Sequence, residues 1–349
     1  MPRDPRFLIL AEGFFNPLRS KTANACIRYS PQRVAAVLDS TQRGKTAAHV
    51  LGFGDGIPVV GSFDEGLAHK PNALLIGIAP PGGQLPAEWR AVILRALDDG
   101  LDVWSGLHFF LGDDAEFAAH AAKTGATIHD LRRPPADLQV AAGRVREVDA
   151  TVILTVGTDC NIGKMTAALQ LLDGVRARGH RVAFAGTGQT GILVDGKGIS
   201  VDAVVADFIA GAAERLVLES AHDADIVLVE GQGSIIHPSY SGVTYGLLHG
   251  SMPHAQVMCA QPTRTAIRNH EWMPIPPLPE FIRMCERVAL RPAPVIAVAL
   301  NTFDLDDAQA RDAVARVADE TGLPTTDPVR FDPAPIVEAI DAFHRNRAR

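Results

Sequence analysis

The sequence lacks most of the features that mark membrane, secreted or metal-stabilised proteins. Its four cysteines, Cys26, Cys160, Cys259 and Cys285, are scattered without a CxxC pair or a histidine at zinc-finger spacing, which indicates reduced thiols in a cytoplasmic protein. No apolar run approaches the roughly 20 residues that a membrane-spanning helix needs. The apolar part of "MPRDPRFLIL" is too short for a signal peptide. We therefore expect a cytoplasmic protein that does not bind a membrane.

The chain also lacks an excess of positive charge. Its 33 lysine and arginine residues are outnumbered by 40 aspartate and glutamate residues, so the formal net charge is −7. A nucleic-acid or anionic-membrane surface needs a basic face, and we expect neither partner. With 349 residues, 47% of them hydrophobic, the chain is long enough for two domains with separate cores. We expect a homo-oligomer, the common form of soluble oligomers.

Apolar runs of strand length alternate with helix-like segments along the whole sequence. Such alternation indicates parallel sheets covered by helices. In the first half we expect strands over residues 7–10, 34–38, 73–79 and 101–104 and a helix over 87–100. In the second half we expect strands over 151–156, 181–186, 225–231, 255–260 and 294–300 and a helix over 164–179.

The segment 132–150 contains two prolines and no clear apolar period, so we interpret it as a linker. The prediction is an N-terminal Rossmann-like α/β domain, residues 1–145, and a C-terminal P-loop NTPase-like doubly wound α/β domain, residues 146–349. The proline-rich run at 271–280 is incompatible with a helix or a central strand, and a loop or lid is expected there. In a doubly wound sheet, ligands bind beyond the carboxyl ends of the strands. That rule places on one rim Gly157, Gly186, Glu230 and Asn301.

A glycine-rich turn, "GTDCNIGKMT", joins the expected strand at 151–156 to the helix that follows it. It departs twice from the pattern GxxxxGK[ST], because Gly157 lies six residues before Gly163 instead of five and Met165 takes the Ser/Thr place. The context still favours a phosphate site made of backbone N–H groups and Lys164. The alternative is a tight turn capped by its own polar side chains. The residues expected to bind a cofactor are Gly157, Thr158, Asp159, Cys160, Asn161, Ile162, Gly163, Lys164, Met165 and Thr166.

Acidic and histidine side chains follow several of the expected strands. Glu230 stands at a carboxyl end, where P-loop proteins place an acid that contacts magnesium or a reactant. Asp207 lies near a helix start and is either a cap or an acid of the site. His237 follows Glu230 by seven residues and His108 follows another strand, so each is a candidate base or a surface-loop histidine. Cys160 is either a small residue that fits the loop or a nucleophile.

Several of these strings together resemble one family. The segments "GTDCNIGKMT", "TGQTGIL", "VDAVVADF", "EGQGS..HP" and "LLHGS", with "GKTA", "LLIGIAP.GG" and "GLHFFL.DD" upstream, closely resemble the D-glutamate N-acetyltransferase family. The resemblance runs from about Asn24 to Asn301. More distantly, the second half is similar to dethiobiotin synthetase, which shares a "GTD...GK" loop and a "VEG" strand end.

The family resemblance implies transfer of an acetyl group from acetyl-CoA to the amino group of D-glutamate. Coenzyme A presents phosphates without transferring them, so a hydroxyl in place of Met165 is dispensable and neither magnesium nor another metal is expected. Thr166 is the alternative metal ligand if the helix begins one residue later. The attacking amine must lose a proton, and we expect His237 first and Glu230 second as the base. Asp207 is a further catalytic candidate.

The two carboxylates of D-glutamate call for cationic or hydrogen-bonding partners. The expected substrate-binding residues are Gln189, Thr190, Gln232, Arg28 and Lys45. Arg264 is another possible partner, and oxyanion donors are expected in "GQGS" or "TGQTG". Two alternatives stay open. One is an ATP-dependent kinase or ligase similar to dethiobiotin synthetase, which Lys164 and Glu230 favour and Met165 disfavours; the other is a nucleotide-binding module without catalytic activity.

Overall fold

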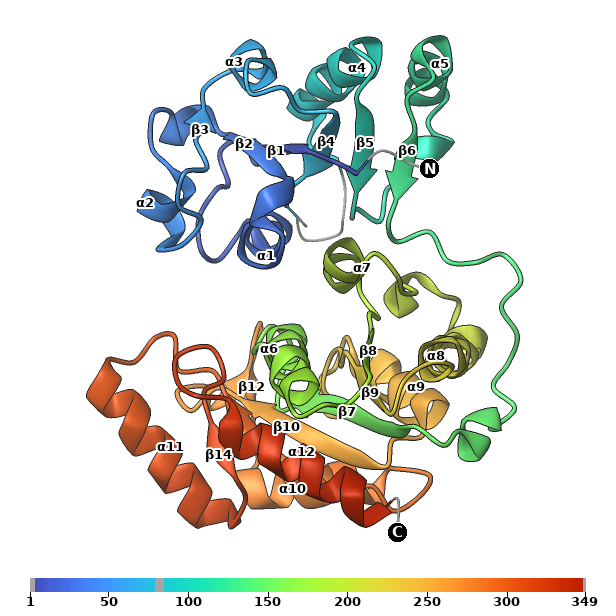
Figure 1. Cartoon of the computed structure of the whole chain (residues 1–349), viewed down its shortest axis with the longest axis vertical. Coiled ribbons are helices and arrows are strands. Elements are labelled where there is room, and N and C mark those ends of the chain that lie inside the picture. The colour runs from blue at the N-terminus through green and yellow to red at the C-terminus, as the bar shows by residue number, and fades with distance from the viewer. Residues whose placement is uncertain (1–3, 79–84, 348–349) are drawn as a thin grey trace. The chain divides into compact units, whose positions relative to one another are not determined.

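A computed structural model describes residues 4–78 and 85–347 of the chain, which form two compact units (Figure 1). The first unit contains the described residues up to Pro134 together with Ile192–Gly196. The second contains Pro135–Gly191 and the described residues from Lys197 onward. The main change of unit therefore falls between two adjacent prolines inside the segment 132–150.

The N-terminal unit is built on a six-stranded parallel sheet of order β3-β2-β1-β4-β5-β6. Every residue of β1, β2 and β4 is buried, as expected for a parallel sheet with both faces covered. The strands are β1 Phe7–Leu10, β2 Val34–Leu38, β3 Val59–Val60, β4 Ala73–Ile76, β5 Asp102–Ser105 and β6 Ile128–Asp130, and the helices are α1 Lys21–Tyr29, α2 Ala47–Leu51, α3 Phe63–Leu67, α4 Arg90–Asp98 and α5 Ala115–Thr124.

The C-terminal unit contains a second six-stranded parallel sheet, of order β14-β13-β10-β7-β9-β8. A separate antiparallel hairpin pairs β11 with β12. The strands are β7 Thr151–Gly157, β8 Val182–Ala185, β9 Ile226–Val229, β10 Ala255–Ala260, β11 Ala266–Ile267, β12 His270–Pro274, β13 Val295–Leu300 and β14 Thr325–Thr326, and the helices are α6 Lys164–Ala177, α8 Ala206–Ala221, α9 Ser241–Ser251, α10 Leu278–Arg287, α11 Asp307–Thr321 and α12 Ala334–Arg347. Helix α7, Gln189–Asp195, begins in this unit, and its residues from Ile192 onward belong to the first unit.

Glycines let the helices of this unit pack closely in pairs. A methyl group on Gly174 of α6 would lie 2.6 Å from the Val337 side chain of α12, and one on Gly250 of α9 would lie 2.0 Å from the backbone oxygen of Ala210 in α8. Each unit has its own cluster of buried apolar side chains. Within the described residues, none of the helices is long and apolar enough to cross a membrane.

The predicted α/β architecture, with one parallel sheet in each half, is confirmed. The strand expected over 73–79 ends at Ile76, and its last residue lies outside the described residues. The prediction of a loop or lid over 271–280 is wrong, because β12 continues to Pro274 and α10 begins at Leu278. Proline is tolerated at a strand end of a two-stranded hairpin and in the first turn of a helix. Pro279 occupies such a first-turn position.

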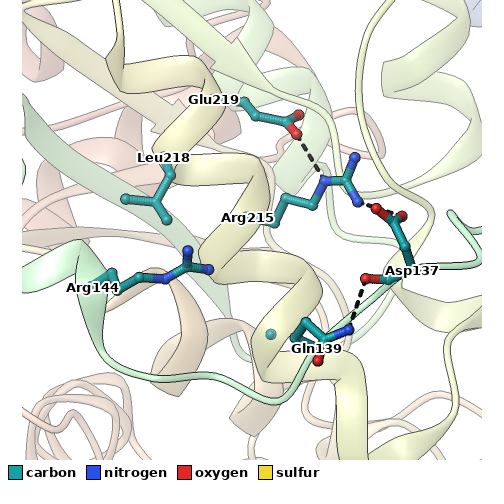
Figure 2. Close-up of a pocket in the computed structure, with 7 residues that line it drawn as sticks. Asp137, Gln139, Arg144, Arg215, Leu218 and Glu219 are labelled. Atoms are coloured by element: carbon teal, nitrogen blue, oxygen red, sulfur yellow. Dashed lines mark hydrogen bonds and ion pairs between the residues drawn. The ribbon is translucent and has the colours of Figure 1, made fainter.

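The segment predicted as a linker is bound to the C-terminal unit along helix α8. Figure 2 shows Asp137, Gln139 and Arg144 beside this helix, where Arg215 donates to Asp137. The buried Glu214 carboxylate accepts hydrogen bonds from the backbone of this segment at Ala142 and Arg144, and from the Arg144 side chain. These contacts explain how an extended segment without an apolar period keeps a fixed path.

The closest approach of this segment to α8 occurs at Gly211, where a methyl group would lie 1.7 Å from the backbone oxygen of Gln139. Gly211→Ala is therefore expected to lower the thermal unfolding midpoint of the C-terminal unit by about 2–10 °C, because overpacking costs ~1–3 kcal/mol. Gly242→Ala, on α9, is the matched control, since nothing lies within 4 Å of a methyl group there. Equal midpoints for the two variants in calorimetry would contradict the close contact.

Candidate active site

The glycine-rich turn forms a loop, residues 157–164, between β7 and α6, and we call this loop the cradle. Asn161 and Gly163 adopt φ angles of 55° and 105°, so the chain reverses sharply before the helix, at a position that favours glycine. A methyl group on Gly157 would lie 2.7 Å from the Ile162 side chain. The turn leads directly into the start of α6 at Lys164, and the first N–H groups of a helix, which lack partners within it, form the kind of site that binds anions.

Lys164 is buried within the cradle. Its Nζ donates a 2.6 Å hydrogen bond to the backbone oxygen of Asp159, and methyl groups on Gly157 or Gly231 would each lie 3.2 Å from its Cδ. Burial lowers the pKa of Lys164, because a charged ammonium is less stable away from water. An ammonium has three hydrogens to donate, so an anion in the cradle would stabilise its charge.

Asp159 fixes the shape of the cradle. Its Oδ2 accepts hydrogen bonds from Arg264 Nη1 at 3.0 Å and from the backbone N–H of Arg268 at 2.9 Å, and its Oδ1 accepts the N–H of Cys160 at 2.7 Å. The same Arg264 nitrogen donates to the backbone oxygen of Cys160 at 2.9 Å. Arg264, weighed from the sequence as a substrate partner, therefore holds the cradle to the segment after β10.

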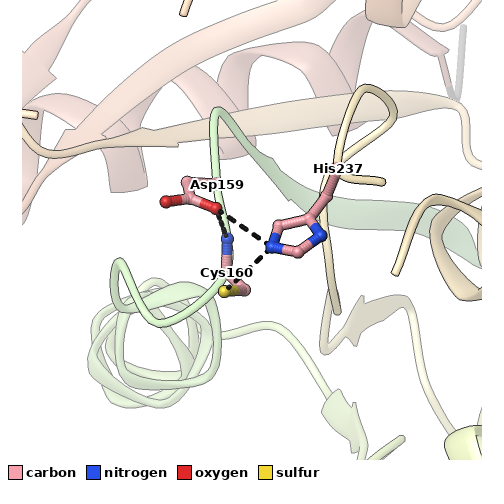
Figure 3. Close-up of side chains that lie close together, drawn as sticks. All are labelled: Asp159, Cys160 and His237. Carbon is pink, nitrogen blue, oxygen red and sulfur yellow. Dashed lines mark hydrogen bonds and ion pairs between the residues drawn. The ribbon is translucent and has the colours of Figure 1, made fainter. Parts of the chain in front are cut away.

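His237 lies over the cradle, on the loop that connects β9 to α9 (Figure 3). Ser234 ties this loop to the cradle by donating a 3.1 Å hydrogen bond to the Thr158 backbone oxygen. The His237 Nδ1 accepts the N–H of Ser239 at 3.1 Å. Its Nε2 lies 3.6 Å from the Cys160 Sγ and 3.8 Å from an oxygen of Asp159. The ring is buried, and burial lowers its pKa.

The hydrogen bond from Ser239 decides which nitrogen of His237 carries the proton. Because Nδ1 accepts, the neutral ring is protonated at Nε2. A nucleophile–histidine–acid triad needs the acid at one ring nitrogen and the nucleophile at the other, whereas Cys160 and Asp159 both face Nε2. A metal ion bound by this ring next to Cys160 and Asp159 would need the lone pair of Nε2, which the proton occupies in this tautomer. In this group of three residues, the protonated Nε2 of His237 therefore points at Cys160 and Asp159 of the cradle.

Glu230 is the second buried acid near the cradle. Its Oε2 accepts the backbone N–H groups of Thr187 and Gly188 at 2.9 and 3.1 Å. Burial is the largest influence and raises the pKa of Glu230 to about 7, with a further increase from the charge of Asp202. A carboxyl group with this pKa exchanges a proton readily at neutral pH.

Glu230 and His237 belong to one loop but have different neighbours. Glu230 contacts residues 187–188, which follow β8. His237 packs against the ring of His270, which follows β10 in the hairpin, at 5.3 Å between ring centroids. The charge of Lys164 influences the pKa of both groups. The cradle thus has an acidic group on the β8 side and an imidazole on the β10 side.

Other residues predicted for the site lie elsewhere or are already hydrogen-bonded. Asp207 is exposed in the first turn of α8, and its carboxylate makes no hydrogen bond or ion pair with any described residue. Gln189 and Thr190 begin α7. The Gln232 amide donates to the Thr187 backbone oxygen at 2.6 Å. The N–H of Gly188, one of the expected oxyanion donors, binds Glu230 instead, as does the N–H of Thr187.

Three predicted residues belong to the N-terminal unit, so the cradle's own unit does not contain them. Arg28 lies over the ring of Phe53, 4.0 Å from its centroid. Lys45 donates to the Gln42 side chain at 2.8 Å. His108 is exposed after β5. Their roles in substrate binding or catalysis stay predictions.

Several residues that shape the site carry no recognisable sequence signal. Ser239 sets the tautomer of His237 through its backbone, and Thr187 and Gly188 hold Glu230 in the same way. A backbone N–H is common to all residue types, so no motif marks these contacts. Arg268 also acts through its backbone N–H. The nearby Arg264 differs, because its cationic side chain was already a candidate partner of the substrate.

Met165 occupies the first turn of α6, where a magnesium-dependent P-loop protein places a hydroxyl. A thioether is a soft ligand, and magnesium requires oxygen ligands. The residue in this position therefore does not fit a magnesium site of the usual P-loop type.

Taken together, the two sheets and the cradle define an α/β protein with a Rossmann-like domain followed by a P-loop domain. The family model for the Rossmann-like domain of DUF1611 matches residues 40–134, and the model for its P-loop domain matches residues 139–337. Both carry the description "domain of unknown function". The chain belongs to the DUF1611 family.

Two curated relatives of the chain are named D-glutamate N-acetyltransferase. The protein from Tritonibacter scottomollicae is 39% identical over 284 residues, which cover 80% of this chain and 84% of the relative. The protein from Pseudoalteromonas sp. is 35% identical over 259 residues, covering 73% and 77%. A crystal structure of a DUF1611 family protein from Anabaena variabilis has a TM-score of 0.93 and 39% identity, covering 97% of this chain and 99% of that chain. The resemblance to the D-glutamate N-acetyltransferase family is confirmed, and the chain is a member.

The raised pKa of Glu230 makes a testable contribution to stability. Its ordinary value is 4.5 and its folded value is about 7, so between these pH values the folded protein holds a proton that the unfolded chain has lost. Stability contributed by this group therefore falls as pH rises from about 4.5 to 7. Glu230→Gln is expected to gain stability relative to the parent protein between pH 5 and pH 8, measured by urea unfolding.

The exposed Glu271 supplies the matched control, because Glu271→Gln should leave the difference from the parent protein nearly unchanged between the two pH values. If Glu230→Gln behaves like this control, the pKa of Glu230 is not raised by burial.

Proposed function

We propose that this protein transfers the acetyl group of acetyl-CoA to the amino nitrogen of D-glutamate. The observation that carries the proposal is a buried carboxyl group with a pKa of about 7, Glu230, beside a cradle in which Met165 follows the lysine. This combination supplies a base and an anion site without the hydroxyl that holds magnesium. It suits acyl transfer better than phosphoryl transfer, which depends on the metal. The names of the two curated relatives support the same reaction.

In this proposal the cradle binds the phosphates of coenzyme A. Backbone N–H groups at the start of α6 and the buried ammonium of Lys164 provide donors and positive charge. Coenzyme A leaves the reaction with all of its phosphates, so the site has to grip them without polarising a phosphorus–oxygen bond. Lys164 and backbone N–H groups can do this without a metal ion.

Glu230 is the general base of the proposed reaction. The ammonium of free D-glutamate must lose a proton before its nitrogen attacks the thioester carbonyl. A carbon–nitrogen bond forms, the carbon–sulfur bond breaks, and the coenzyme A thiolate leaves and takes up a proton. Glu230 ionises near neutral pH because it is buried, which matches the pKa of a base to the working pH. His237, the first candidate from the sequence, offers only Nδ1 as an acceptor, and Ser239 occupies it.

The sequence names only candidate partners for the two carboxylates of the substrate. Arg28, Lys45, Gln189, Thr190 and Gln232 keep this role in the proposal. Arg264 is less suited to it, because its guanidinium is bound to Asp159.

An ATP-dependent kinase or ligase is the rival class. It shares a cradle lysine and a strand-end acid with the proposed enzyme, and it differs in requiring magnesium and a hydrolysable nucleotide. A nucleotide-binding module without catalytic activity is the third possibility. One assay that varies the nucleotide, the metal and the acceptor separates all three.

The protein is expected to release free thiol from acetyl-CoA when D-glutamate is added, and to do so undiminished by a chelator. The reason is that neither the amine attack nor the cradle uses a metal ion. The measurement is thiol release followed with a chromogenic disulfide, with D-glutamate, L-glutamate and no acceptor as parallel reactions.

Lys164→Ala is the companion variant, and it should raise the KM for acetyl-CoA far more than the KM for D-glutamate. Loss of activity on chelation, or turnover that requires ATP, would favour the kinase or ligase. An equal change in both KM values would remove the cradle from coenzyme A binding. Binding of a nucleotide without any turnover would favour the third possibility.

Glu230→Gln is expected to lower kcat by about 10²- to 10⁴-fold, the usual contribution of a general base. In the parent protein kcat should rise with pH and level off above about pH 7, where Glu230 is ionised. In the variant that rise should disappear and be replaced by a dependence on the free amine, extending to higher pH. Glu230→Asp keeps a carboxylate and should retain the plateau. A normal pH profile in Glu230→Gln would assign the base elsewhere.

A further inference from the structure

His237 presents a hydrogen-bond donor to the cradle that has only weak or distant partners there. Its Nε2 lies 3.6 Å from the Cys160 Sγ, a hydrogen bond to a weak acceptor, and 3.8 Å from the Asp159 Oδ1 (Figure 3), whereas N–H···O bonds usually measure about 2.7–3.2 Å. The Asp159 oxygen already accepts the N–H of Cys160. The imidazole is only 2% exposed. A buried donor with weak partners costs free energy until a better acceptor arrives.

The surroundings of the ring fix both its orientation and its charge. Ser239 holds Nδ1 from one side, and the Tyr240 ring lies 4.6 Å away between centroids. Lys164 and His270 disfavour a second proton, and Asp159 favours one. Burial is the largest influence and lowers the pKa of the ring, which favours its neutral form. The Ser239 N–H at Nδ1 leaves the proton of that form on Nε2.

The charged and titratable groups around the ring come from three elements. The cradle and α6 supply Asp159, Cys160 and Lys164, the His237 loop supplies Tyr240, and the segment after β10 supplies Arg264 and His270. The charge of Lys164 attracts an anion to the cradle, whereas the Arg264 guanidinium is bound to Asp159; the neutral Nε2–H of His237 adds a directed donor.

We propose that His237 completes the cradle as a neutral hydrogen-bond donor to a phosphate oxygen of the coenzyme. The proposal rests on the proposed function, in which that coenzyme is acetyl-CoA. An anion seated on the N–H groups of the cradle meets Lys164 from below and the Nε2–H of His237 from the β10 side. The phosphate oxygen then replaces the distant contacts with Cys160 and Asp159. His237 is a binding residue for the coenzyme in this arrangement, and Glu230 on the β8 side is left for the proton transfer.

Two substrates with the same thioester separate this role from that of a base. S-acetylpantetheine carries the reacting group of acetyl-CoA but has no phosphate. His237→Ala should raise the KM for acetyl-CoA about tenfold or more, since a hydrogen bond to a charged group is lost, and should leave kcat/KM for S-acetylpantetheine unchanged. Glutamine can place its amide N–H near the position of Nε2, so His237→Gln should retain most of the affinity.

Calorimetric titration with coenzyme A gives a readout that does not depend on turnover. The Kd should increase about tenfold or more for His237→Ala, by the same factor at pH 6.5 and pH 8, because the donor is neutral at both. His222, with a side chain that is 83% exposed, provides the control variant His222→Ala, which should bind like the parent. Thermal unfolding of each variant checks that it is folded. If His237→Ala does not fold, the titration is carried out with His237→Gln.

The outcomes distinguish the inference from the function on which it rests. If the parent protein does not bind coenzyme A, the proposed function fails and the inference with it. If the parent binds but His237→Ala binds equally well, or loses the same factor with S-acetylpantetheine, only the inference is overturned and His237 returns as a catalytic candidate. A loss several-fold larger at pH 6.5 than at pH 8 would indicate a cationic His237 and would also overturn it.

Discussion

The burial of one lysine is the constraint on which the rest of this site depends. Placing an ammonium away from water is unfavourable unless hydrogen bonds and opposite charge surround it. Lys164 is held by the Asp159 backbone oxygen, and its side chain packs closely against Gly157 and Gly231, where a methyl group would lie 3.2 Å from its Cδ. The cradle therefore has a built-in demand for an anion. The proposed coenzyme phosphate would supply that negative charge.

The parallel sheet brings the partners of this lysine together. The carboxyl ends of β7, β9 and β10 lie side by side, so the segments that follow them meet around the cradle. The segment after β10 contributes Arg264, which is bound to Asp159, and the segment after β9 contributes Glu230 and His237. Residues more than 100 positions apart in sequence thereby become neighbours. In open α/β sheets, ligands bind beyond the carboxyl ends of the strands, and the proposed site lies at such a rim.

The contrast between Asp159 and Glu230 shows how surroundings assign roles to similar groups. Asp159 accepts a hydrogen bond from a guanidinium as well as from two backbone N–H groups, which makes it a structural anchor. Glu230 accepts two backbone N–H groups, and burial raises its pKa to about 7. One carboxyl group fixes the cradle, and the other is suited to proton transfer.

The sequence by itself determined the α/β architecture, with a Rossmann-like domain followed by a P-loop domain, because each depends on local periodicity or on a short contiguous motif. It did not determine the hairpin and helix at 271–280, where prolines occupy positions that tolerate them. It also could not decide between His237 and Glu230. That choice depends on the Ser239 N–H and on burial, and both exist only when separate strand ends come together in the folded chain.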